Sequence, residues 1–395
     1  MTRVVLAERH AKPAWAGHPN VYDGAVLRVE GEAATGDEVD VVDHRGRYVG
    51  RGVWHATSPV RVRIYRGDEG PLDAAFVRAR IAEAVALRRD VLRLPDRTDG
   101  WRVVHGDGDR FPGLVADQYG PWVVVQVTTL AAAQRRTEIA DALLAECGAR
   151  GVWERAATSY AKAEEFHAGG GRLAGEAAPE TAEFREDGVV WKIDLHGGPK
   201  TGHFLDQRDN RAAFAALCKG RRVLDVFSGT GGFGVAAATN GGAASVVAID
   251  ASKSSIERLV ENAKSNGVAE RVETHVGDAF DKLRALVGEN ARFGAVSVDP
   301  PRFAASRREL PGAIRGYREL NLRALQLLEP GGILATSSCT GVLTDEDFER
   351  VVRDAAVDAR RRVQILRRGG QGPDHPWLTA APESRYLKHF LARVL

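Results

Sequence analysis

The sequence has few cysteines, no long apolar run and almost no net charge. Its 395 residues include three cysteines, Cys147, Cys218 and Cys339, whose spacing matches no metal-binding pattern. We therefore expect no disulfide framework and no metal site, and a reducing cytosol fits this cysteine usage. No stretch approaches the ~20 apolar residues of a membrane span, and the first residues are too short an apolar run for a signal peptide. The sequence predicts a cytoplasmic protein without membrane contact.

Lysine is also scarce, because arginine supplies 46 of the 55 basic residues. The formal net charge of +2 excludes a strongly basic tail as the basis of nucleic-acid binding, although a local patch stays open. Arginine holds phosphates in a bidentate fork and stacks on bases, so the bias permits contact with RNA. A GC-rich genome would produce the same bias without any function.

The first two segments of the chain differ in their local patterns. Residues 1–72 contain short runs of alternating apolar and polar residues and predict a small β-rich domain, with strands at 25–30, 38–43 and 60–65. Residues 73–185 predict a small central α/β domain, with helices at 74–92 and 137–147 and strands at 101–105 and 122–127. In the first segment Arg61 and Arg63 share one strand face and could touch phosphate, with a solvated face as the alternative. The central segment carries no recognisable chemistry by its residues alone.

Residues 186–395 have the most regular pattern. Apolar runs typical of buried strands alternate with helical periods, which predicts a parallel sheet covered on both faces. The expected strands are 222–227, 245–250, 271–276, 295–299 and 333–337. Thr344 is placed to cap a helix, and no helical pattern separates the strand at 363–366 from the last one, at 386–394. We therefore expect the last strand to run antiparallel.

A glycine-rich turn follows the first of these strands. Gly229, Gly231 and Gly234 satisfy the pattern G-x-G-x-x-G, and Asp250 ends the next strand, 21 residues after Gly229. A carboxylate at that place can accept hydrogen bonds from both hydroxyls of a ribose. This much fits a dinucleotide and S-adenosylmethionine equally well.

Two further acids favour S-adenosylmethionine. Asp225 ends the strand before the glycine turn, where it would repel a pyrophosphate but suits a cationic methionine group. Asp278 ends the third strand, where it can bind an adenine amino group while Phe280 packs on the ring. Alternatively, Asp225 caps a turn and Asp278 caps the following helix.

The fourth and fifth strands end in reactive groups. Asp299 is followed by Pro300 and Pro301, which fix a rigid turn at the carboxyl edge of the sheet, where such folds bind ligands. Cys339 ends the fifth strand and is expected at the same edge. Its thiolate could attack C6 of a pyrimidine and make C5 nucleophilic toward a sulfonium methyl group. A small residue that merely packs is the alternative for Cys339.

Several motifs together carry a resemblance to a known family: those at 200–211, 299–303, 315–317, 338–341 and 374–376, and the N-terminal run at 18–26. By these motifs the chain resembles the RlmI-type 23S rRNA cytosine-C5 methyltransferases. The resemblance implies an N-terminal PUA domain, a central domain and a class I methyltransferase domain that binds S-adenosylmethionine. It also implies that Gln207 closes over the cofactor, that Cys339 is the nucleophile and that Asp299 orients the base. With the residues above, the candidate cofactor contacts are Gln207, Asp225, Phe227, Gly229, Gly231, Asp250, Asp278 and Asp299.

RNA contact is the least direct expectation. Several arginines follow the Asp299 turn, and Arg302 and Arg315 are the candidates to hold phosphates of 23S rRNA. A solvated helix face with internal ion pairs is the alternative. His375 is a candidate for the base that removes the C5 proton, unless it belongs to a structural His-Pro turn.

Other functions stay open on the residues alone. N-methylation of guanine or adenine needs the Asp299 turn but no cysteine. A nicotinamide-dependent oxidoreductase shares the glycine turn and Asp250 but gives no reason for Asp278. A non-catalytic RNA-binding module would have no affinity for S-adenosylmethionine. The sequence is silent on oligomeric state, so a homodimer stays open.

Overall fold

A computed structural model describes residues 1–197 and 201–395. The contacts between these residues divide the chain into two compact units. The first unit contains residues 1–182 and 373–384 together with 194–202, apart from the undescribed residues 198–200. The second unit contains residues 183–193, 203–372 and 385–395.

The N-terminal part of the first unit is a six-stranded sheet with the order β2-β6-β5-β4-β1-β3. Val4, Val39 and Val62 are fully buried in its core, because alternate residues of a strand point to the same face. The strands expected at 25–30, 38–43 and 60–65 are confirmed as β3, β4 and β6. The strands are β1 (Arg3–Leu6), β2 (Asn20–Tyr22), β3 (Val26–Glu30), β4 (Glu38–Val42), β5 (Tyr48–Trp54) and β6 (Val60–Arg66), and helix α1 is Ala11–Trp15.

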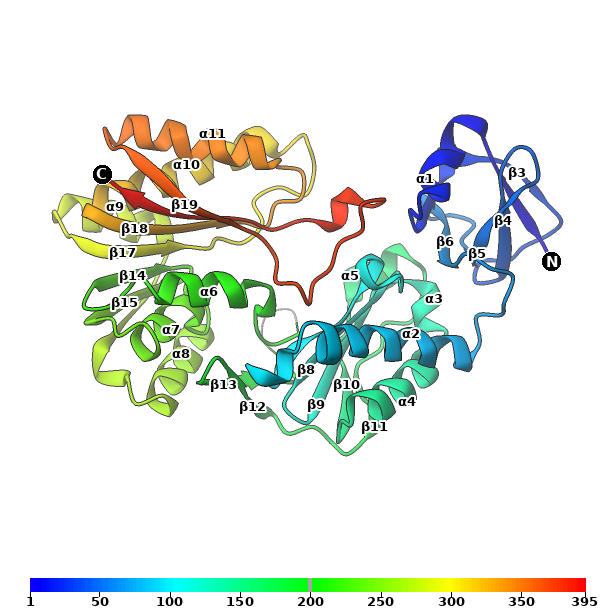
Figure 1. Ribbon diagram of the computed structural model, residues 1–395, viewed down its shortest axis with the longest axis horizontal. Coiled ribbons are helices and arrows are strands. Elements are labelled where there is room, and N and C mark those ends of the chain that lie inside the picture. Colours follow the sequence, from blue (N-terminus) through cyan, green and yellow to red (C-terminus); the bar gives the residue numbers. More distant parts are fainter. Residues whose placement is uncertain (198–200) are drawn as a thin grey trace. The chain divides into compact units, whose positions relative to one another are not determined.

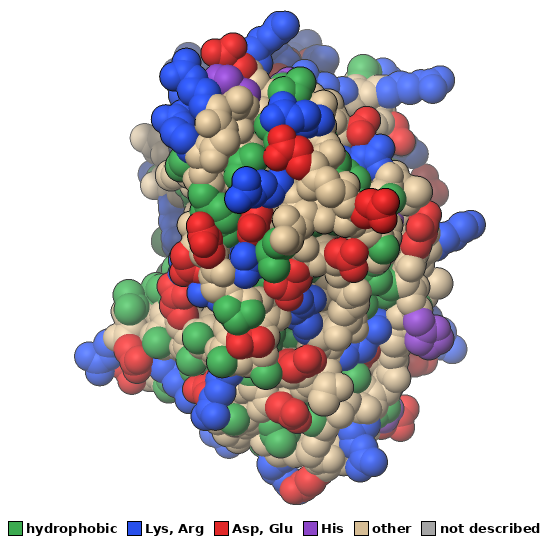
Figure 2. Space-filling model, turned by 90° about the vertical axis from the view of Figure 1, so that its right-hand side faces the viewer, with side chains coloured by type: hydrophobic (Ala, Val, Ile, Leu, Met, Phe, Trp, Pro, Cys, Tyr) green, Lys and Arg blue, Asp and Glu red, His purple; other side chains and the backbone are tan. Residues whose placement is uncertain are grey.

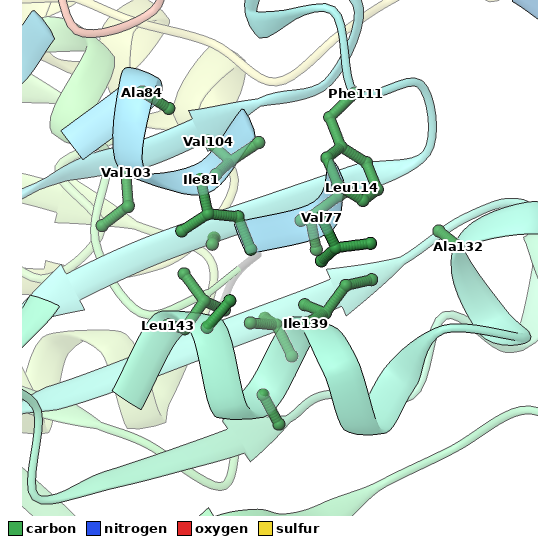
Figure 3. Close-up of a cluster of buried hydrophobic side chains, with 14 of the residues drawn as sticks. Val77, Ile81, Ala84, Val103, Val104, Phe111, Leu114, Ala132, Ile139 and Leu143 are labelled. Carbon is green, nitrogen blue, oxygen red and sulfur yellow. The ribbon is translucent and has the colours of Figure 1, made fainter. Parts of the chain in front are cut away.

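The rest of the first unit is built on a five-stranded sheet with the order β11-β10-β9-β8-β7. Figure 3 shows Val77 and Ile81 of helix α2 packed with Ile139 and Leu143 of helix α4 in its buried core. The expected helix at 74–92 is α-helical to Ala86 and continues as a π-helical turn. The elements are α2 (Ala74–Ala86), β7 (Gly100–His105), β8 (Leu114–Tyr119), β9 (Trp122–Val127), α3 (Leu130–Ala133), α4 (Arg136–Cys147), β10 (Gly151–Glu154), α5 (Thr158–Ala163) and β11 (Gly171–Gly175).

The second unit is dominated by a seven-stranded sheet with the order β16-β15-β14-β17-β18-β20-β19. Its strands are parallel except for β20, which runs antiparallel to both of its neighbours, as the sequence predicts. The strands are β14 (Arg222–Val226), β15 (Ser245–Asp250), β16 (Val272–Val276), β17 (Phe293–Val298), β18 (Leu328–Ser338), β19 (Val363–Gly369) and β20 (Lys388–Val394). The hairpin of β12 (Thr181–Glu186) and β13 (Val189–Asp194) precedes this sheet in the chain.

Helices cover both faces of this sheet (Figure 1). One layer contains α6 (Arg208–Ala215), α7 (Gly232–Thr239) and α8 (Lys253–Ser265), and the other contains α9 (Ala279–Gly288), α10 (Leu310–Leu327) and α11 (Asp345–Asp358). Thr344 caps α11 as expected, because its hydroxyl accepts a hydrogen bond from the Asp347 amide at 3.1 Å. The fold is thus a mixed α/β fold with a β-rich N-terminal part.

The surface and the helices show two further properties. Among the described residues, none of the helices combines the length and the apolar character that a membrane crossing requires. On the face drawn in Figure 2, basic and acidic side chains are interspersed, in keeping with the net charge of +2.

Candidate active site

The glycine loop joins strand β14 to helix α7. Phe227, Gly229 and Gly231 all have positive φ angles there, of 60°, 50° and 97°. A Cβ at Gly231 would lie 2.6 Å from Cγ2 of Val235, so this position requires glycine for space as well as for backbone conformation. Phe227 is a bulky residue in the left-handed region, a strain that the surrounding structure must hold and that clusters at functional sites.

Asp225 fixes this loop through hydrogen bonds. Its Oδ2 accepts a hydrogen bond from the Gly234 amide at 2.7 Å, and its Oδ1 accepts one from the Ser297 hydroxyl on strand β17. Burial raises the pKa of the Asp225 carboxyl to about 6, although both hydrogen bonds act in the opposite direction. The structure therefore gives Asp225 a role in fixing the loop, and its direct contact with a cofactor stays a prediction.

Asp250 and Asp278 lie at the carboxyl ends of the next two strands, as expected. The Asp250 carboxylate accepts hydrogen bonds from the amides of Gly229 and Ser252, both at 2.8 Å, and so ties the glycine loop to strand β15. Asp278 caps helix α9 through the amides of Phe280 and Asp281, at 2.9 and 3.1 Å. The capping role is thus present, and the adenine contact of Asp278 stays a prediction.

Gln207 is buried beneath the sheet edge, only 2% exposed. Its side-chain amide donates to the Ser337 hydroxyl at 3.1 Å and accepts from the Asn210 amide at 2.7 Å. Ser337 in turn bonds Nδ1 of His389 at 2.9 Å. Gln207 is therefore held at both ends of its amide, and closure over the cofactor stays a prediction. Lys200, the first residue of the same motif, lies outside the described residues.

The residues of the loop fit S-adenosylmethionine. Ser228 Oγ is buried within the loop and forms no hydrogen bond with the described part of the chain, so it is available to a polar group of a ligand. A Cβ at Gly229 would meet no described atom within 4 Å, so the loop faces open space there. Three acids and a strained glycine turn on one sheet edge are suited to a cationic nucleoside.

The reaction half of the edge is formed by β17 and β18. These strands pair in parallel with Val298 opposite Thr336, so the following residues Asp299 and Cys339 leave the sheet at the same edge. Cys339 is partly exposed, whereas Cys147 and Cys218 are buried. Burial raises the pKa of both buried thiols to about 12, which leaves Cys339 as the cysteine with access to a substrate.

Tyr317 connects the elements around Cys339. Its hydroxyl bonds Thr340 Oγ1 at 2.8 Å, and the amide of Phe303 donates to the same oxygen at 3.3 Å. The rings of Phe303 and Tyr317 lie 4.7 Å apart. Burial raises the pKa of the Tyr317 phenol, and the charges of Cys339 and Asp299 raise it further. The phenol therefore lies close to both predicted catalytic groups and stays neutral.

The sequence reasoning missed Lys388, which lies at the same place. The residue is 4% exposed, and its ammonium group donates to the carbonyl oxygens of Thr340 and Tyr386, at 2.9 and 3.0 Å. No local motif marks this residue, because the contacts form only when β20 pairs with β18. One signal was available: Lys388 is the only lysine after Lys282.

The arginines near the Asp299 turn fall into two groups. Arg318 pairs with Asp358 at 2.7 Å, as the alternative of a solvated, ion-paired helix face requires. Arg302 and Arg315 are exposed and form no ion pair with any residue in 1–197 or 201–395, and the same holds for Arg307 and Arg308. These four remain candidates for phosphate contact.

His375 lies in the first unit rather than among the residues of the reaction edge. Its ring is 1% exposed, 3.1 Å from the Asp374 carboxylate and 5.1 Å from the ring of His105. The carboxylate of Asp374 also accepts a hydrogen bond from the Arg102 amide at 3.0 Å. His375 thus belongs to a structural His-Pro turn of the first unit, whereas Cys339 belongs to the second unit.

Comparison with known families agrees with this geometry. The family model of S-adenosylmethionine-dependent methyltransferases matches residues 135–383, and that of a PUA-like domain matches residues 4–66. Fold and site therefore define a methyltransferase that uses S-adenosylmethionine as its cofactor and has an N-terminal PUA-like domain. A protein from Streptococcus mutans described as a SAM-dependent methyltransferase has this fold over the full length of both chains, with a TM-score of 0.84 at 21% identity. A second solved structure, SMU.776, described as a methyltransferase complexed with SAH, has a TM-score of 0.86 at 21% identity, also over the full length of both chains.

Close relatives make the identification more specific. Ribosomal RNA large subunit methyltransferase I of Citrobacter koseri is 36% identical over 395 residues, covering 100% of this chain and 99% of the relative. The protein of the same name from Salmonella arizonae is 37% identical, with coverage of 100% and 98%. The chain belongs to the family of ribosomal RNA large subunit methyltransferase I.

Proposed function

We propose that this protein transfers a methyl group from S-adenosylmethionine to C5 of a cytosine in 23S rRNA and so makes 5-methylcytidine. The observation that supports this best is the placement of Cys339, a partly exposed thiol on the same sheet edge as Asp299. The relatives named above are methyltransferases of the large-subunit ribosomal RNA, which supports RNA as the substrate.

The proposed reaction begins with Cys339. Its thiolate forms a bond to C6 of cytosine, and the electron pair of the C5–C6 double bond moves to C5. Asp299 hydrogen-bonds the N3 and N4 edge of the base and holds it in place. S-adenosylmethionine, when bound, would supply an electrophilic methyl group. The electron pair on C5 forms the bond to this methyl group, and S-adenosylhomocysteine is the leaving group. A base then removes the C5 proton, the double bond forms again and Sγ of Cys339 leaves C6.

The cofactor contacts are proposed from the same edge. Asp250 would receive the ribose hydroxyls, Asp278 the adenine amino group, and Gln207, Phe227, Gly229, Gly231 and Asp299 would line the site. Asp225 would act mainly through the loop, because it is buried, at 1% exposed, and both of its oxygens are bonded within the protein, whereas Asp250 is only half-buried.

RNA binding is assigned to two regions. Arg302 and Arg315 would hold phosphates beside the reacting base, because both are exposed and form no ion pair with the described residues. We assign residues 1–72 as a PUA-like RNA-binding domain, 73–185 as a central domain and 186–395 as the methyltransferase domain. The target cytosine must be unstacked, because its C5–C6 edge is otherwise out of reach of a thiol.

A labelling experiment tests the proposal. Tritiated S-adenosylmethionine is incubated with rRNA from cells that lack the enzyme, and the RNA is digested to nucleosides. We expect label in 5-methylcytidine with the wild type and with Cys147→Ala, and none with Cys339→Ala. Label in a methylated guanosine or adenosine, or labelling that survives Cys339→Ala, would instead support N-methylation and contradict the covalent route.

A further inference from the structure

Lys388 is a buried cation at the first residue of strand β20. Its Nζ donates to two backbone carbonyl oxygens, those of Thr340 at 2.9 Å and Tyr386 at 3.0 Å. Neither Asp nor Glu forms an ion pair with Lys388 in the part of the chain that the structure describes. A buried ammonium group without a counter-charge is costly, so its retention here needs an explanation.

The strand pairing places Lys388 around the nucleophile. In the antiparallel pairing of β18 and β20, Lys388 lies opposite Ser338, the residue before Cys339. Its ammonium group holds the carbonyl oxygen of Thr340, the residue after Cys339. Lys388 therefore contacts the backbone on both sides of the thiol.

Three charged side chains act on the Lys388 ammonium group. Burial lowers the pKa of the Lys388 ammonium group, while the charges of Asp345 and Cys339 raise it and that of Arg385 lowers it. Asp345, the larger of the two negative causes, is already paired with Arg385 at 3.0 Å, so Cys339 is the second negative group that raises the pKa of Lys388. The charges of Asp299 and Cys339 both raise the pKa of Tyr317, and a negative charge on Asp299 opposes a thiolate at Cys339.

The neighbouring histidine does not supply a base. His389 is bonded to Ser337, on the opposite side of strand β20 from Lys388. Burial lowers the pKa of the His389 ring to about 3, so it is too weak a base to take the thiol proton at neutral pH. Tyr317 has a raised pKa and is neutral as well.

We infer that Lys388 is a positioning residue for Cys339: its ammonium group is the counter-charge that keeps the thiol ionised, and its two hydrogen bonds fix the turn that presents Sγ. The inference rests on the proposed function, because it gives Cys339 the role of nucleophile. It adds a buried cation, bonded to the backbone beside Cys339, that favours the ionised form of that nucleophile.

The wild-type protein gives the first test. Alkylation of Cys339 by iodoacetamide is followed by peptide mass spectrometry as a function of pH, since only the thiolate reacts. We expect a midpoint clearly below the pKa of about 8.5 of an unperturbed cysteine. A midpoint at or above that value overturns the inference without the need for any variant.

Variants separate charge from structure. Lys388→Met keeps the length of the side chain. It should raise the midpoint of Cys339 alkylation by about 1–3 pH units and lower the alkylation rate at pH 7 by about tenfold or more. Lys388→Arg restores the charge and should restore most of the shift. Lys264→Met removes an exposed lysine from α8 and serves as the matched control. An unchanged midpoint in Lys388→Met, with circular dichroism and S-adenosylmethionine affinity of the wild type, contradicts the role of Lys388.

The two proposals fail in different assays. If Cys339 is not the nucleophile, methylation survives Cys339→Ala while the thiol profile still responds to Lys388→Met. If Lys388 has only a structural role, methylation needs Cys339 but the alkylation midpoint does not move. If both proposals hold, Lys388→Met lowers kcat for methylation more than it changes KM, and a higher pH restores part of the methylation rate.

Discussion

The two halves of the sheet edge in the second unit are built differently. At the cofactor half, the carboxylates of Asp225 and Asp250 bond backbone amides of one short loop, those of Gly234 and Gly229. At the reaction half, the residue after Cys339, Thr340, is bonded by side chains from distant parts of the chain, those of Tyr317 and Lys388. The cofactor half is formed by residues close together in the sequence. The contacts of the reaction half form only when distant strands of the sheet pair.

The largest effect should come from the reaction half. Cys339→Ala removes the proposed nucleophile and should lower kcat on the order of 10³-fold or more, while the affinity for S-adenosylmethionine stays that of the wild type. Single-turnover methylation and calorimetric titration of the cofactor measure the two quantities. Loss of cofactor affinity in this variant would show that the two halves are not separate.

The buried carboxyl of the cofactor half should give a pH-dependent stability. The pKa of Asp225 is about 6 in the folded protein against 3.8 for an ordinary Asp, so between these values the folded state binds this proton more tightly than the unfolded chain. Stability is therefore lost as the pH rises from about 4 to about 6, by about 3 kcal/mol in total. Asp225→Asn should remove this dependence.

Urea unfolding of both proteins from about pH 4 to about pH 7 measures it as the difference between wild type and Asp225→Asn, because other groups titrate equally in both. A difference that is independent of pH would contradict the raised pKa of Asp225.

The exposed arginines should affect RNA binding alone. Arg302→Ala and Arg315→Ala should each weaken RNA binding, because each substitution removes one contact to a phosphate. The slope of the logarithm of the binding constant against the logarithm of the salt concentration should fall in magnitude by about 1. Arg318→Ala is the matched control, since Arg318 is paired with Asp358. An equal loss of slope in the control would indicate a general charge effect.

The smallest effect should come from the hydroxyl of Tyr317. Tyr317→Phe removes its hydrogen bond to Thr340 at 2.8 Å and should cost about 0.5–1.5 kcal/mol of unfolding free energy. Tyr160→Phe alters an exposed tyrosine and should cost nothing measurable. A loss beyond that range, or a loss equal to that of Tyr160→Phe, would contradict the structural role given to the hydroxyl.

The sequence predicts the cofactor half well because its information is local. A strand, a glycine turn and an acid at the next strand end all lie within the run from Asp225 to Asp250. The strands of the seven-stranded sheet were expected within a few residues, apart from the early start of β18 at Leu328, whereas the hairpin of β12 and β13 was not predicted. The antiparallel direction of the last strand was predicted from the absence of a helix before it.

The parts that were missed depend on pairing between distant residues. Strand β8 escaped because Asp117, fully buried and bonded to Arg102, breaks its apolar pattern. Lys388 has no local motif, since its partners lie near residue 340. The N-terminal cap made by Asp278 was weighed from the sequence, but its bonds to two amides required the helix itself.

The central claim is that Cys339 bonds to C6 of the target cytosine, and trapping measures this most directly. RNA that contains 5-fluorocytidine is incubated with S-adenosylmethionine and the protein, because fluorine at C5 cannot be removed as a proton is. Our account predicts a stable complex in which mass spectrometry finds the methylated nucleotide attached to the peptide that contains Cys339. A protein that methylates normal rRNA but gives no such adduct would contradict the account.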